Sequence, residues 1–209
     1  ANIGTLDIND GDVERVYVYS YNLNSEALNV EINASVVSEV VSYLVGYELV
    51  NVNGVYGKVE AVAKIDGYYY ATLQDAINAA ESGDTVTLLD NITLTTTARV
   101  ANDKVITLDL NGKTISGTDS ATGSYALIEN KGNLTITGNG KISFTDTGVG
   151  SSSASWGAYT IRNTGTLVIE NGTIENLSAQ NVAGKPFAHT TLAIFQYSGS
   201  CTINGGTIS

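Results

Sequence analysis

The sequence predicts an all-β fold in which most of the chain is a solenoid of stacked parallel strands, with one short helix and a small β-rich module ahead of it. A phrase of alternating apolar residues around an Asn/Gly turn recurs four times after residue 105. The chain has 22 Gly and only one Pro, so its turns are built from Gly and Asn. Val, Ile, Thr and Tyr, which favour strands, are frequent.

The charge balance argues against two classes of partner. Ten Lys and Arg stand against 21 Asp and Glu, a formal net charge of −11 over 209 residues. This charge repels phosphate backbones and anionic lipid surfaces, so neither nucleic acid nor a membrane is expected as a partner. No run approaches the roughly 18 apolar residues needed to span a bilayer. With one Cys and one His, the sequence predicts no cofactor and no metal site.

Residues 1–57 are expected to form a separate β-rich attachment module. The stretch DVERVYVYSYNL alternates between polar and apolar residues, as a half-buried strand does. The following stretch, ALNVEINASVVSEVVSYLVGYELV, is apolar and leaves both strand and helix open.

Residues 58–84 predict a hairpin followed by a capping helix. Asp66-Gly67 is a good two-residue turn between strands over 61–65 and 68–71. Thr72 and Asp75 have the spacing of a capping box, and Gly83 supplies a stop. The apolar positions of this helix follow helical spacing: Leu73, Ala76, Ile77 and Ala80. We expect this apolar face to cover the exposed end of the solenoid.

Residues 85–209 are interpreted as about four coils of a parallel solenoid that continues beyond Ser209. The recurring phrases are ITLDLNGKTISG, LTITGNGKISF, LVIENGTIENL and CTINGGTIS, and their aligned glycines are Gly112, Gly140, Gly172 and Gly206. A second element, as in YALIENKGNLTI, precedes three of the four phrases. Four hairpins would need a partner sheet, for which the sequence has no signature. One coil per repeat needs none, because equivalent strands stack on one another.

Stacked coils place equivalent apolar residues in columns. The expected columns are Ile115, Ile142, Ile174 and Ile208; Ile128, Ile161 and Ile194; Leu134, Leu167 and Cys201; and Leu110, Ile136, Ile169 and Ile203. Asn111, Asn139 and Asn171 are expected to stack at a corner before the turn glycines, where Asn and Gly tolerate left-handed backbone.

Residues 71–117, ATLQDAINAAESGDTVTLLDNITLTTTARVANDKVITLDLNGKTISG, with the following ALIENKGNLTITGNGKI, resemble the start of right-handed parallel β-helix domains of the pectate-lyase-like superfamily. The likeness is to domains of gut bacterial surface proteins and of tailed-phage fibre proteins, and it covers about two thirds of the chain. It implies a right-handed parallel β-helix. Because this fold carries lyases, hydrolases, adhesins and fibres alike, it leaves the function open.

The repeat region does not predict an active site. Enzymes of this superfamily, as the resemblance implies, need converging carboxylates. Glu129 aligns with Arg162 and Phe195, a mixed column that predicts a surface ion pair. His189 is expected in a loop. The residues most suited to contact a glycan or a partner are Tyr125, Trp156, Tyr159, Phe187 and His189, although the rings could equally pack the loops on the coils.

The sequence therefore favours a non-enzymatic structural or attachment protein, a β-helical fibre or decoration protein on a tailed-phage virion. Residues 1–57 would bind capsid or tail proteins, and the loops would contact host-surface glycans. The resemblance to phage fibres implies a homotrimer. The alternatives are a secreted or cell-surface adhesin of a gut bacterium and, after it, a polysaccharide lyase or hydrolase.

Overall fold

A computed structural model of the chain describes residues 12–19, 30–119, 125–146, 156–178 and 189–209. The described chain is all-β with one helix and contains several parallel sheets. It divides into two compact units, unit 1 over residues 1–76 and unit 2 over residues 77–209, with the boundary inside the helix.

Unit 1 is built from seven described strands. They are β1 (Val13–Tyr19), β2 (Glu31–Asn33), β3 (Val37–Tyr43), β4 (Tyr47–Val52), β5 (Val55–Glu60), β6 (Ala63–Ile65) and β7 (Tyr68–Tyr70). Strands β1 and β3 pair in parallel, and β5 pairs with β2 and β4 in antiparallel. Alternation buries one face of β1, through Val16 and Val18, in a small core with Val30, Ile32, Val37 and Leu44. From residue 30 on, the segment for which the sequence left helix and strand open contains strands and no helix.

The hairpin and the helix form where they were predicted. Strands β6 and β7 pair in antiparallel around Asp66-Gly67, and Asp66 has a φ of 50°. Helix α1 (Leu73–Ala79) begins after Thr72, whose Oγ1 accepts the backbone N–H of Asp75 at 3.1 Å, as an N-cap does. The predicted apolar face, Leu73, Ala76, Ile77 and Ala80, is buried. No helix in the described ranges is long and apolar enough to cross a membrane.

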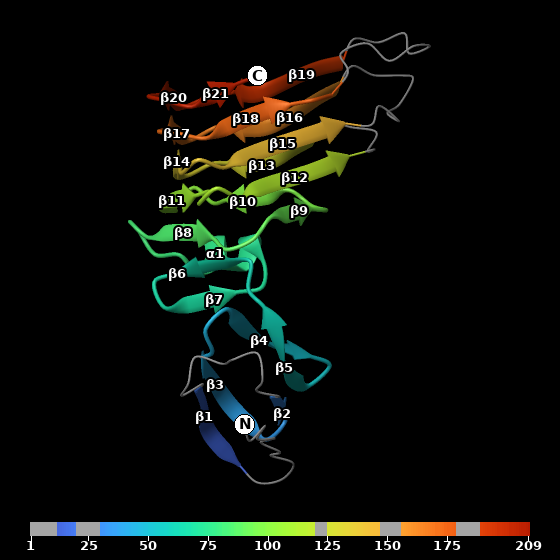
Figure 1. The fold of residues 1–209 in the computed structure, drawn as a ribbon, viewed down its shortest axis with the longest axis vertical. Coiled ribbons are helices and arrows are strands. Elements are labelled where there is room, and N and C mark those ends of the chain that lie inside the picture. The colour runs from blue at the N-terminus through green and yellow to red at the C-terminus, as the bar shows by residue number, and fades with distance from the viewer. Residues whose placement is uncertain (1–11, 20–29, 120–124, 147–155, 179–188) are drawn as a thin grey trace. The chain divides into compact units, whose positions relative to one another are not determined.

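Unit 2 consists of three parallel sheets that the chain visits in rotation (Figure 1). The first sheet contains β8 (Thr85–Leu88), β11 (Val105–Asp109), β14 (Asn133–Thr137), β17 (Thr166–Ile169) and β20 (Ser200–Ile203). The second contains β9 (Ile92–Leu94), β12 (Thr114–Asp119), β15 (Lys141–Asp146), β18 (Thr173–Asn176) and β21 (Thr207–Ile208). The third contains β10 (Ala98–Val100), β13 (Tyr125–Asn130), β16 (Trp156–Asn163) and β19 (His189–Gln196).

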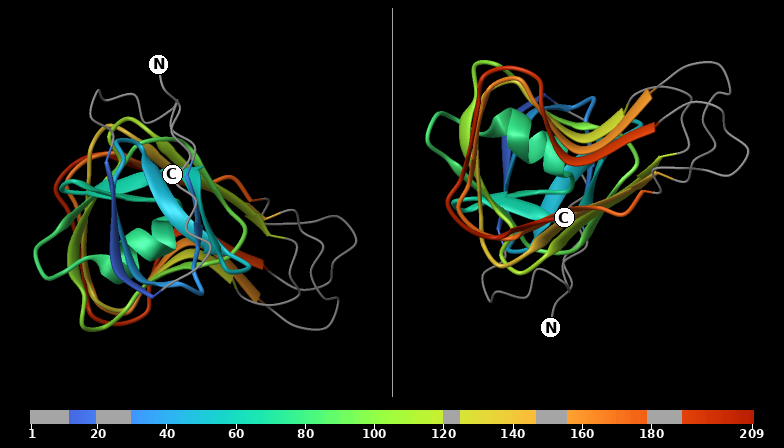
Figure 2. Two further views of the ribbon diagram at one scale, coloured as in Figure 1. Left: turned by 90° about the horizontal axis from the view of Figure 1, so that it is seen from below. Right: turned by 90° about the horizontal axis from the view of Figure 1, so that it is seen from above.

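Successive passes through the three sheets lie over one another, and seen end-on their traces follow nearly the same outline (Figure 2). Each strand pairs in parallel with the strand three places further along the chain. Val168 lies opposite Thr135 and Thr202, and Ile174 lies opposite Ile142 and Ile208. The Asn/Gly phrase is therefore a corner between two sheets and not a hairpin. The arrangement is compatible with a β-helix-like fold.

Three of the four predicted apolar columns are confirmed by the strand register. These are the columns that begin at Ile115, Ile128 and Leu134. Their members are almost fully buried as far as Ile174, Ile161 and Leu167. The interior of unit 2 is thus lined by like residues stacked from pass to pass, as dense packing of a repeat requires.

The fourth column is confirmed from Ile136 through Ile169 to Ile203, but its first member and the first corner were predicted out of register. Ile136 lies opposite Leu108, not Leu110. The reason is an additional residue at the first corner, where the N–H of Lys113 bonds to the Leu110 carbonyl at 2.7 Å across a tight turn. Asn111 and Gly112 both have positive φ in this turn, 46° and 73°. Gly112 is therefore not equivalent to the later turn glycines.

The exposed Asn stack is confirmed for two of its three members. Asn171 Nδ2 donates to Asn139 Oδ1 at 2.7 Å. Asn111 does not join this stack, because the longer corner directs its amide to the Leu88 carbonyl at 2.8 Å.

A second amide stack, which was not predicted, begins with two buried residues, Asn130 and Asn163. Asn130 Nδ2 donates to Asn163 Oδ1 at 2.7 Å, and Asn163 Nδ2 donates to Gln196 Oε1 at 2.9 Å. Both Asn side chains are fully buried. They satisfy backbone groups at the corner that leads from the third sheet into the first, where buried polar atoms need partners.

Candidate functional site

The third sheet of unit 2 carries an open groove of about 570 Å³ on its outer side. Strands β10, β13, β16 and β19 all contribute to it, together with the segment that leads into β10. The lining residues are Thr95, Thr96, Thr97, Arg99, Tyr125, Ala126, Glu129, Tyr159, Arg162 and Phe195. We call this surface the sheet-three groove.

A row of charged side chains crosses the groove. Strand register places Arg99, Glu129, Arg162 and Phe195 at equivalent positions of four neighbouring strands. Glu129 Oε2 lies 3.4 Å from Arg99 Nη1, and Glu129 Oε1 lies 3.3 Å from Arg162 Nη1 and 3.6 Å from Lys131 Nζ. One carboxylate thus meets three cations, which leaves a local excess of positive charge on an acidic chain.

The ion pair between Glu129 and Arg162 was predicted, and Arg99 was missed. The signal for Arg99 was weak because β10 is only three residues long and lies in the first coil, outside the recurring phrases. The Glu129 side chain is only 13% exposed, whereas Arg99 and Arg162 are 61% and 38% exposed. The guanidinium groups are therefore the charges that a ligand meets first.

An aromatic cluster lies beside the charged row. The rings of Tyr159 and Phe195 stack with centroids 4.4 Å apart, and the ring of Phe195 meets that of Tyr197 edge-on at 5.9 Å. Arg162 lies over the Tyr197 ring at 5.2 Å. A Cβ at Gly157 would overlap the Tyr159 hydroxyl, so a glycine is required for this position of the ring.

Tyr125 has a partly structural role. Its ring stacks on Phe144, which is fully buried, with centroids 5.3 Å apart. Tyr125 also lines the groove. Its position is therefore consistent with both roles that the sequence left open, packing and ligand contact.

The structure places the five predicted contact residues in different parts of the third sheet or leaves them undescribed. Tyr125 and Tyr159 are brought together in the groove. Trp156 and His189 begin β16 and β19 and are neighbours in the parallel register. The prediction of a loop at His189 is wrong, because pairing with β16 extends β19 to this residue. Phe187 lies outside the described residues.

The groove combines charged and aromatic side chains with one carboxylate. Glycoside hydrolysis needs two carboxyl groups that flank the scissile bond, and the residues lining the groove include one carboxylate, whose oxygens face cations. Within the described ranges, no group of three or more His, Cys, Asp or Glu side chains is placed to hold a metal ion. The guanidinium groups supply hydrogen-bond donors and the half-buried ring of Phe195 supplies apolar area, whereas Tyr159 is buried beneath it.

No protein-family model, no curated protein and no solved structure matches the chain.

Proposed function

We propose that the protein is a non-catalytic attachment protein whose unit 2 is a right-handed parallel β-helix and whose sheet-three groove binds a glycan. The observation that carries the proposal is the row of Arg99, Glu129 and Arg162 beside the stacked rings of Tyr159 and Phe195.

The β-helix is supported by the order of the strands. Each return to the same sheet is a parallel crossover, and such crossovers are right-handed in nearly all proteins. Columns such as Ile115, Ile142 and Ile174 supply the continuous core that a coil cannot form alone. A body held by strand pairing along its whole length is stiff, which suits a protein that presents a binding surface away from its anchor.

The glycan is supported by the mixture of groups in the groove. Aromatic rings match the apolar faces of sugar rings, and two guanidinium groups can donate to hydroxyl or carboxylate oxygens. The volume of about 570 Å³ is within the range of ligand sites, and the groove is open, as a polymer requires.

We propose attachment and not glycan cleavage, because the one carboxylate in the groove, Glu129, already forms ion pairs with two arginines. Glu129 accepts from Arg99 and Arg162, and protonation of a glycosidic oxygen would require it to leave both cations. We place this attachment protein on a virion, as a trimeric fibre with residues 1–57 as the anchor.

The test is a calorimetric titration of the whole chain with soluble glycans chosen from an array screen. Arg162→Gln and Phe195→Leu should each weaken binding at least tenfold, about 1.4 kcal/mol. The matched control is Lys141→Gln, which removes another exposed cation that pairs with a carboxylate, Glu175, at 3.1 Å on the second sheet. Equal affinity of all variants, or failure of every glycan to bind, would contradict the proposed function.

A further inference from the structure

Unit 1 carries a second cleft, of about 520 Å³, which is lined by tyrosines. Parts of β1, β3, β4 and β7 form its walls. Nine of the 12 tyrosines of the chain lie in residues 1–76, and six of them line this cleft: Tyr17, Tyr43, Tyr47, Tyr68, Tyr69 and Tyr70. We call it the tyrosine cleft.

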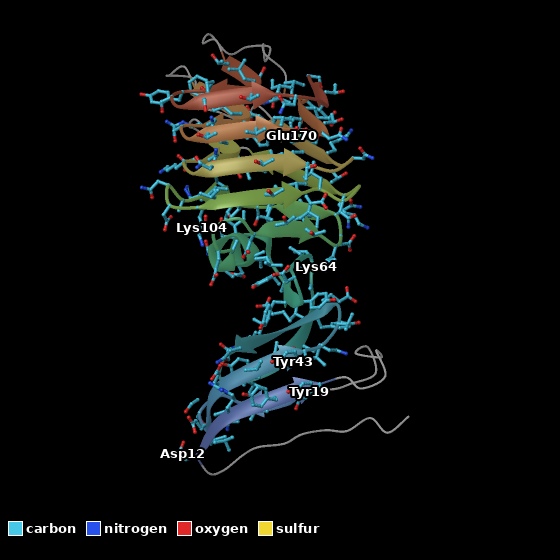
Figure 3. The ribbon with its side chains drawn as sticks, turned by 90° about the vertical axis from the view of Figure 1, so that its left-hand side faces the viewer. Asp12, Tyr19, Tyr43, Lys64, Lys104 and Glu170 are labelled. Carbon is cyan, nitrogen blue, oxygen red and sulfur yellow. The ribbon has the colours of Figure 1, made fainter. Side chains whose placement is uncertain are left out.

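The spatial arrangement of the rings on β1 and β3 follows from strand geometry. Tyr17 and Tyr19 are two residues apart on β1 and therefore share a face, and Tyr19 lies in register with Tyr43 on β3. The ring centroids of Tyr19 and Tyr43 are 4.8 Å apart and those of Tyr17 and Tyr19 are 6.2 Å apart. Figure 3 shows the side chains of Tyr19 and Tyr43 on these neighbouring strands. All three rings are about half exposed, which is an unusual amount of aromatic surface for a folded unit.

The tyrosines of unit 1 already hold cations. The Arg15 guanidinium lies 5.8 Å from the centre of the Tyr17 ring and donates to the Tyr17 hydroxyl at 3.1 Å. Lys58 Nζ lies 4.4 Å from the centre of the Tyr47 ring. These contacts show which chemistry this surface favours, because a phenol offers a cation both a π-face and an oxygen acceptor.

The net charge of unit 1 also favours a cationic ligand. Residues 1–76 contain eleven Asp and Glu against three Lys and Arg, a formal balance of −8. Glu39 and Glu48 line the cleft, and Arg15 already pairs with Glu39. Burial raises the pKa of Glu48, the hydrogen bond that its Oε2 accepts from the backbone N–H of Ala71 lowers it, and the carboxylate of Asp75 raises it. A cation in the cleft would favour the ionised form of Glu48.

We propose that the tyrosine cleft docks a basic peptide segment of a partner protein, with a Lys or Arg side chain placed among the tyrosine hydroxyls and Glu48. Charge complementarity carries this assignment, because an acidic unit attracts a basic segment and steers its approach. We assign this basic segment to a partner protein, and within residues 1–209 the ten Lys and Arg are scattered singly. The proposal concerns unit 1 and does not depend on glycan binding in the sheet-three groove.

The test is fluorescence anisotropy of the whole chain with a labelled peptide of alternating Arg and Gly. Glu48→Gln and Tyr43→Leu should each weaken binding about tenfold, because each removes a group that faces the cation. Tyr43→Phe, which keeps the ring, should lose less than Tyr43→Leu. The matched control is Glu14→Gln, which makes the same change in charge at an exposed residue of β1 outside the cleft lining and should change affinity less than twofold.

Three outcomes would overturn the proposal. They are no binding of the basic peptide, equal losses for Glu48→Gln and Glu14→Gln, and tighter binding of an uncharged oligosaccharide or a Pro-rich peptide. Circular dichroism of each variant separates a lost contact from a lost fold. Arg162→Gln should leave peptide binding unchanged, so this assay and the glycan titration can fail independently.

Discussion

Replacement of Asn163 by Ala should destabilise unit 2 more than replacement of any other Asn side chain described above. Asn163 is fully buried, and its amide nitrogen donates to the carbonyls of Gly165 and Ser200 and to Gln196 Oε1 at 2.9–3.1 Å. Its oxygen accepts from Asn130 Nδ2 at 2.7 Å. An amide NH2 has two hydrogens, so with the bond from Asn130 these contacts amount to about three hydrogen bonds. At about 1 kcal/mol each, their loss costs about 3 kcal/mol, and Asn130 stays buried without this acceptor.

Asn171→Ala is the matched control for this prediction. Asn171 belongs to the exposed amide stack, where water can replace its bonds to Asn139 and to the Gly172 N–H. We expect a loss of about 0.5–1 kcal/mol. The chain has one Trp, Trp156 in β16, so Trp fluorescence during urea unfolding reports on unit 2. A loss for Asn163→Ala no larger than that for Asn171→Ala would refute the role of the buried stack.

The remaining predictions concern close packing, protonation and strand register. Gly165→Ala should lower the free energy of unfolding by about 1–3 kcal/mol, because its Cβ would overlap the Gly132 carbonyl. A Cβ at Gly67 would meet no atom within 4 Å, so Gly67→Ala should change the free energy of unfolding by less than about 0.5 kcal/mol. Thermal melts of both variants measure this, and equal losses would contradict close stacking at Gly165. Burial raises the folded pKa of Glu48, so wild type loses stability as pH rises through the carboxyl range. In melts at several pH values, Glu48→Gln should be slightly more stable at pH 7 and equal to wild type below about pH 4, and an advantage that persists in acid would contradict this cause. Backbone NOEs should connect Val168 with Thr135 and Thr202, and cross-strand NOEs to residues 173–176 would contradict the parallel register.

Much of unit 2 could be predicted because each structural position recurs in several coils, so the same residue type appears several times in the sequence. The column through Ile142 and Ile174 is visible as a recurring apolar residue at a similar interval, and the register confirms it. The hairpin at Asp66 and the helix after Thr72 were predictable because their signals are local. Two facing positions, Glu129 and Arg162, followed from the same alignment.

The errors came from features that a repeat alignment does not contain. One additional corner residue shifted Leu110 and Gly112 out of register, since corners vary in length while strands do not. The buried stack through Asn130 was missed because Asn is read as a turn residue. In unit 1, the stacking of Tyr19 on Tyr43 depends on a parallel pairing between distant strands, which no local pattern indicates.

Mass spectrometry of the whole chain incubated with a glycan panel tests the central claim most directly, because it detects intact complexes and cleaved sugars in one experiment. The proposed attachment function predicts complexes with intact glycans for wild type and for Lys141→Gln, and their loss in Arg162→Gln. Shortened or unsaturated sugars that appear with wild type would contradict it and would make the protein an enzyme.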